Sequence, residues 1–144
     1  MISKEEKNII YVRLEKGEEI LSSFYEIVKK HNITSGWING IGAICDVQIG
    51  SYNLKGKDYN KVNLEGDYEL ISLMGNISQK NNDPFLHLHV TLSDEKCIAY
   101  GGHLFSAKIL ATGEFFIKKT ESMIPREYDD NIGLYLWEFK DCDK

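Results

Sequence analysis

The segment 85–93, FLHLHVTLS, most constrains the fold, because it alternates strictly between two kinds of side chain. Successive side chains of a β-strand point to opposite faces, so Leu86, Leu88 and Val90 share one face. The turn sequence DEK follows, and then a second β-type run, CIAYGGHL. The two runs predict a β-hairpin with one face in the core and one face outside it.

Three of the four histidines lie on this hairpin. His87 and His89 are two residues apart, so they project together from the face opposite the apolar residues. His103 follows Gly101 and Gly102, whose missing side chains would let the backbone approach a neighbouring strand. If the strands pair, the third imidazole converges on the first two. Three protein ligands with one position left for water are a common catalytic zinc set.

We therefore expect His87, His89 and His103 to bind a divalent metal, with zinc first among the ions that imidazole suits. A simpler interpretation stays open, in which the histidines are solvent-facing or hydrogen-bonded to each other. His31 is not included, because it lies at the end of a predicted helix, where the helix dipole explains a histidine.

Catalysis by a metal-bound water would also need an acid or base. Glu69 and Asp94 are the nearest carboxylates in the sequence. Glu69 is our candidate catalytic residue, since it interrupts an apolar strand, although an exposed sheet edge would explain it equally. A metal-dependent lyase or hydrolase acting on an unidentified small molecule is one hypothesis.

The N-terminal third predicts one strand and one helix. Residues 8–14 alternate as a strand, and 18–30 carry apolar residues at helical spacing, with acidic residues first and basic residues last. The glycine-rich stretch 33–53 predicts two short strands with bends or bulges.

The remaining segments predict further strands. Strands 59–64 and 68–77 should pair antiparallel across a turn at Glu65-Gly66-Asp67. Residues 105–118 continue as a strand, or as a strand with a short helical turn. Residues 121–130 form a polar loop, and 132–139 form a final strand.

Composition limits the class of protein. A chain of 144 residues without low-complexity segments predicts a single domain, 1–144, with a core at about 8–120. Its charged beginning excludes a signal peptide or membrane span there, so we expect a cytoplasmic protein. Cys45, Cys97 and Cys142 are too widely spaced for a thiolate zinc site and are expected to be reduced.

The net charge of −5 argues against direct binding of nucleic acid. The chain has only two arginines, Arg13 and Arg126, and its lysines form no basic stripe.

Several motifs together resemble one known family. These are GIGAICDVQIG, YELISLMGNIS, PFLHLHVTLSDEKCIAYGGHL and the KGEE before the helix. Over residues 8–120 the chain resembles the PPC domain, the plants-and-prokaryotes conserved domain. The resemblance implies an α+β fold, with a bent, mainly antiparallel sheet flanked by helices, and a homotrimer. It also implies metal ligation by the three histidines of the hairpin.

In plants, this domain follows AT-hook segments that bind the minor groove of DNA through Arg-Gly-Arg cores, which this chain lacks. The fold more distantly resembles α-acetolactate decarboxylase, a zinc enzyme with a similar histidine pattern. Three hypotheses follow: a trimeric metal-binding protein, a metal-independent module that docks proteins or DNA-associated complexes, and a direct DNA binder.

Overall fold

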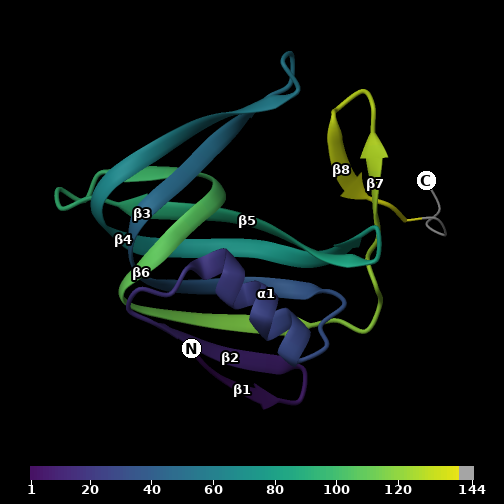
Figure 1. The fold of residues 1–144 in the computed structure, drawn as a ribbon, viewed down its shortest axis with the longest axis horizontal. Coiled ribbons are helices and arrows are strands. Elements are labelled where there is room, and N and C mark those ends of the chain that lie inside the picture. Colours follow the sequence, from purple (N-terminus) through teal and green to yellow (C-terminus); the bar gives the residue numbers. More distant parts are fainter. Residues whose placement is uncertain (140–144) are drawn as a thin grey trace.

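A computed structural model describes residues 1–139, which form eight strands and one helix (Figure 1). The elements in chain order are β1 (Ile2–Glu6), β2 (Ile9–Glu15), α1 (Ile20–Lys30), β3 (Gly36–Asn53), β4 (Asp58–Lys80), β5 (Asp83–Ser93), β6 (Ala99–Lys119), β7 (Arg126–Asp129) and β8 (Leu134–Trp137).

Six strands make one antiparallel sheet in the order β1-β2-β6-β3-β4-β5, and β6 also pairs with β5. The pairings among β3, β4, β5 and β6 therefore close into a ring, which requires long and strongly bent strands. These bends are visible in Figure 1, where β3, β4 and β6 each change direction along their length.

One of these bends depends on a glycine where β3 crosses β6. The pairing of β3 with β6 shifts its register between Gly42 and Ile44. A Cβ atom on Gly42 would lie 2.5 Å from the carbonyl oxygen of Thr112 on β6, closer than any side chain tolerates. The glycine spacing thus lets the two backbones approach at the bend.

Helix α1 covers the inner face of the sheet. The Glu19 carboxylate caps its first turn by accepting hydrogen bonds from the backbone N–H groups of Leu21 and Ser22, at 3.2 and 2.7 Å. Phe24 is fully buried and meets Phe115 of β6 edge-on, with the ring centroids 5.1 Å apart. Burial of this apolar face holds the helix against the sheet.

The predicted fold class is wrong. Residues 1–139 contain a single helix of 11 residues, so the fold is mainly β and not an α+β fold with flanking helices. The antiparallel pairing of the sheet, the helix within 18–30 and the strand within 8–14 agree with prediction.

Two predicted strand breaks are also wrong. Residues 36–53 form one continuous strand, and the expected turn at 65–67 lies inside β4. Opposite Asp46, the pairing of β3 with β4 skips two residues of β4, one of which is Gly66, with φ of +106°. The turn-like sequence therefore forms a β-bulge, because a bulge uses the same positive φ that favours glycine.

The expected polar loop at 121–130 contains β7, which pairs with β8 in a small separate hairpin. This hairpin lies beside the tip of the long β3–β4 arm (Figure 1). The hydroxyl of Tyr52 on that arm donates a hydrogen bond to the carbonyl oxygen of Ile132, at 2.6 Å.

Within residues 1–139, no helix has the length and apolar character needed to cross a membrane. Cys45 and Cys97 are free thiols, and Cys142 lies outside the described residues.

The helix–sheet contact gives a first prediction. Phe24→Ala should lower the free energy of unfolding by about 3–5 kcal/mol, because it removes a fully buried ring and leaves a cavity. Urea denaturation measures the change. Tyr25→Ala is the control, since Tyr25 is 42% exposed on the same helix and should cost under about 0.5 kcal/mol. Equal losses in both variants would contradict this account of the core.

Candidate metal centre

The predicted hairpin of β5 and β6 is confirmed, and it brings the three histidines together. His89 of β5 lies directly opposite His103 of β6. His87 lies two residues before His89 on β5, opposite Asn76 of β4. Leu86 and Leu88, which alternate with the two histidines of β5, are buried in the core.

Gly101 and Gly102 allow the close backbone approach that the sequence predicted. A Cβ atom on Gly102 would lie 2.8 Å from the carbonyl oxygen of Gly50 on β3. One on Gly101 would lie 2.9 Å from the carbonyl oxygen of Val90 on β5. Strand β6 is therefore held tightly between β3 and β5 just before His103.

The ligand atoms of His87, His89 and His103 all lie within 4.8 Å of one another. The Nε2 atoms of His87 and His89 are 3.1 Å apart. Nitrogens bound at about 2.0–2.1 Å to a tetrahedral zinc are separated by about 3.3 Å, close to this spacing. Within residues 1–139, this is the one group of three such side chains arranged to hold a metal.

The half-buried histidines are held in their neutral form. Burial is the main cause that lowers the pKa of His87 to about 4, and the neighbouring His89 and Arg126 contribute. Burial likewise lowers the pKa of His103 to about 4, with contributions from His87 and His89. A neutral imidazole keeps the lone pair that a metal requires.

One nitrogen of the cluster has no hydrogen-bond partner among the described residues. Nδ1 of His103 is buried and makes no hydrogen bond. Leaving a buried polar atom unpaired costs free energy, and such atoms are rare in native structures. Coordination through this nitrogen, or a bound water, would satisfy it, so the donor set fits a divalent metal.

Aromatic rings form the wall beside His103. The Tyr59 ring centroid lies 4.9 Å from the His103 ring, and that of Phe105 lies 4.8 Å from it. Burial is the main cause that raises the pKa of Tyr59, so its phenol stays protonated at neutral pH. The phenol is therefore available as a hydrogen-bond donor next to the cluster.

Arg126 of β7 is a site residue that sequence reasoning missed. Its guanidinium donates to the Ser78 hydroxyl at 2.6 Å and to the Asn76 side-chain oxygen at 2.9 Å. A third hydrogen bond, 2.7 Å long, goes to the carbonyl oxygen of Tyr135. Nothing in the polar loop sequence indicated this position, because the contacts join segments far apart in the chain.

The structure does not bring the predicted carboxylates into the cluster. Glu69 is exposed on β4 and pairs with Ser93, four residues from His89 along β5, or about 13 Å. Asp94 caps its own turn by accepting from the backbone N–H groups of Lys96 and Ile98, both at 2.9 Å. The catalytic role of Glu69 stays a prediction.

The fold and the site define a class: a mainly antiparallel β-sheet protein with three histidines on a hairpin that closes a ring of strands. The chain belongs to the Plants and Prokaryotes Conserved (PCC) domain family, whose model matches residues 1–121. This is the family that the sequence motifs resemble. No curated protein matches the chain significantly in sequence.

Solved structures of three prokaryotic proteins are similar over nearly the whole chain. A Bacteroides thetaiotaomicron protein with a provisional DNA-binding label is 34% identical, with a TM-score of 0.93, covering 96% of this chain and 97% of its own. A PPC protein of Pyrococcus horikoshii is 35% identical, with a TM-score of 0.86 and coverages of 98% and 97%. A protein of Archaeoglobus fulgidus described as metal-containing is 33% identical, with a TM-score of 0.85 and coverages of 96% and 99%.

The predicted distant likeness to α-acetolactate decarboxylase is confirmed at the level of the fold. The Bacillus subtilis enzyme is 17% identical, with a TM-score of 0.57, and the match covers 91% of this chain and 61% of the enzyme.

The lowered pKa values predict how stability depends on pH. In the folded, metal-free protein, His87 and His103 have pKa values of about 4, whereas the ordinary value for histidine is 6.5. Between pH 4 and 6.5 the unfolded chain therefore binds more protons than the folded protein. The free energy of unfolding should therefore be highest above pH 6.5 and fall as the pH drops towards 4. Denaturant unfolding of chelator-treated protein at pH 7 and 4.5 measures this loss.

His87→Gln should reduce the loss, whereas His31→Gln should retain it, because His31 lies at the end of α1 and pairs with Glu5. An unchanged pH dependence in the His87 variant would contradict the prediction.

Proposed function

We propose that this protein binds a divalent metal, with zinc as the first candidate, and presents it to a small-molecule ligand. The observation that carries the proposal is the convergence of three imidazoles whose ligand atoms lie within 4.8 Å of one another, together with the unpartnered, buried Nδ1 of His103. The metal-containing description of the Archaeoglobus fulgidus relative supports it.

The residues around such a metal ion would have different roles. His87, His89 and His103 would hold the cation and leave a position open for water or ligand. A bound zinc supplies Lewis acidity and lowers the pKa of its water to about 7. Tyr59 would donate a hydrogen bond, and Asn76, the cross-strand partner of His87, points to the same side of the sheet as His87. An acid–base role for Glu69 forms no part of the proposal, because Glu69 lies away from the cluster.

Metal content tests this function directly. Untagged protein purified without chelator should hold close to one metal ion per chain, measured by elemental mass spectrometry. His87→Ala/His89→Ala should lose it, because one histidine alone cannot retain the ion. His31→Ala is the matched control and should keep full occupancy. Absence of metal in the wild-type protein after soaking in zinc would favour the metal-independent interaction module.

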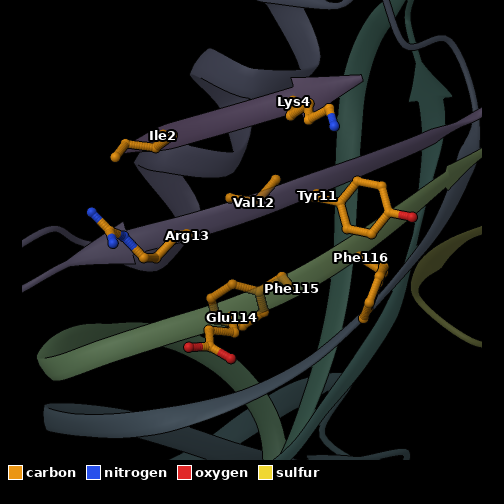
Figure 2. A pocket seen from close by; sticks show the side chains of 8 residues that line it. All are labelled: Ile2, Lys4, Tyr11, Val12, Arg13, Glu114, Phe115 and Phe116. Carbon is orange, nitrogen blue, oxygen red and sulfur yellow. The ribbon is translucent and has the colours of Figure 1, made fainter. Parts of the chain in front are cut away.

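We further propose that the protein assembles as a homotrimer through the outer face of the sheet. Ile2, Tyr11 and Phe116 are 54%, 41% and 47% exposed there, and the rings of Tyr11 and Phe116 pack edge-on at 5.1 Å. Figure 2 shows Tyr11 of β2 and Phe116 of β6 next to each other, with Ile2 of β1 at the other end of the same surface. An apolar surface of this kind is typical of contacts between protein subunits.

The apolar surface and the metal centre belong to one face of the sheet. Cross-strand partners point to the same side of a sheet. Successive cross-strand pairs connect β1 to β5 through a row of one residue on each strand. The row consists of Lys4, Tyr11, Phe116, Asn39, Met74 and His89. A second copy seated on the aromatic end would therefore border the histidine cluster.

Substitution on this face tests the assembly. Phe116→Lys should reduce the mass measured by light scattering from three times the 16.5 kDa chain mass to a single chain, because it places a charge in the interface. Met123→Lys is the control, since Met123 is 56% exposed on another segment. A wild-type protein that is monomeric at all concentrations would contradict the trimer.

Direct contact with DNA is not proposed, despite the label carried by the Bacteroides relative. The chain has a net charge of −5, and one of its two arginines, Arg126, is buried. Binding of DNA by a protein depends on basic side chains that reach the phosphates.

A further inference from the structure

Arg126 is a buried cation without an anionic partner among residues 1–139. Only 9% of the residue is exposed. Its three hydrogen-bond acceptors are a hydroxyl, an amide oxygen and a backbone carbonyl, all of them neutral. No carboxylate of the described residues lies within ion-pair distance of the guanidinium.

A buried charge is costly unless an opposite charge compensates it. The guanidinium group has five N–H donors, and the three contacts account for three of them. Burial lowers the pKa of Arg126, but an arginine still remains protonated at neutral pH. Arg126 therefore holds a positive charge in a partly dehydrated setting, and residues 1–139 leave two of its N–H donors unused.

The guanidinium lies beside the histidine cluster. It binds Asn76, which is the direct cross-strand partner of His87. It also stacks on the Phe85 ring, 4.7 Å from the centroid, and Phe85 precedes His87 by two residues on the same face of β5. The electrostatic effect of Arg126 on His87 is consistent with this proximity.

A divalent ion at the histidines would place a second positive charge next to Arg126. Two neighbouring cations favour an anion that contacts both, as arginine and metal pairs do for carboxylates and phosphates. Arginine is suited to this role because its planar fork matches a carboxylate with two parallel hydrogen bonds.

We propose that Arg126 binds the carboxylate of a small hydroxy- or oxo-carboxylate ligand whose other oxygen faces the metal centre. This inference rests on the proposed metal function for the second contact. The Tyr59 phenol, next to His103, would donate to the same ligand, and Phe85 would keep the guanidinium flat against the sheet.

The small number of arginines makes the proposal measurable. Protein labelled with ¹⁵N-arginine has two Nε–H signals, one from Arg126 and one from the exposed Arg13, which is an internal control. Zinc-loaded protein is titrated with 3-hydroxybutyrate, and separately with 1,3-butanediol, which has the same carbon skeleton without the charge. Sodium chloride at matched concentration controls for ionic strength.

We expect 3-hydroxybutyrate to move the Arg126 signal to saturation, while the Arg13 signal stays in place and the diol moves neither. Arg126→Lys identifies the signal by its loss and should weaken binding about tenfold by calorimetry, because lysine cannot form the paired hydrogen bonds. An Arg126 signal that does not move, or that moves equally with the diol, overturns the proposal even if the lysine variant fails to fold.

Chelator-treated protein separates this inference from the metal function. A saturable shift of Arg126 in a protein that takes up no metal would preserve the anion site and remove the metal centre. Full metal occupancy without any shift would preserve the metal centre and reduce Arg126 to a residue that joins β7 to β4. Failure of both measurements would remove both proposals.

Discussion

The pairing of β6 on both of its edges is the constraint on which the site depends. His103 lies opposite Gly50 of β3 and opposite His89 of β5. Because Gly101 and Gly102 have no side chains, β6 passes close to both neighbours there. The same closure brings His103 to the other two histidines, leaves two of the three imidazoles half-buried and shapes the core beneath them.

Neutral histidines and a charged arginine lie next to each other at this site. Burial keeps two imidazoles neutral, which preserves their capacity to bind a cation. Next to the cluster, Arg126 of β7 binds the cross-strand partner of His87 and holds a permanent positive charge that the described carboxylates do not compensate. A protein that needed only a stable sheet would gain nothing from this arrangement, because an apolar side chain would fill the same space at lower cost.

Local patterns predicted the hairpin and the three histidines, because the alternation at 85–90 and the glycines before His103 act over a few residues. The same reasoning failed at Gly66, since a turn and a bulge both use a glycine with positive φ, and only the partner strand distinguishes them. The plural helices came from family resemblance, whereas the pattern itself predicted one helix. The position of Arg126 could not be predicted from local patterns, because its hydrogen-bond partners on β4 lie 48 and 50 residues away in the sequence.

The order in which these contacts can form has a consequence for folding. The β5–β6 hairpin joins neighbouring segments and can form early, but the pairing of Gly50 with His103 joins segments far apart in the chain. Contacts of this kind form slowly, because a long loop must close before they stabilise anything. The imidazoles of His89 and His103 would therefore meet while they are still exposed to water, and that of His103 would become half-buried only when the ring of strands closes.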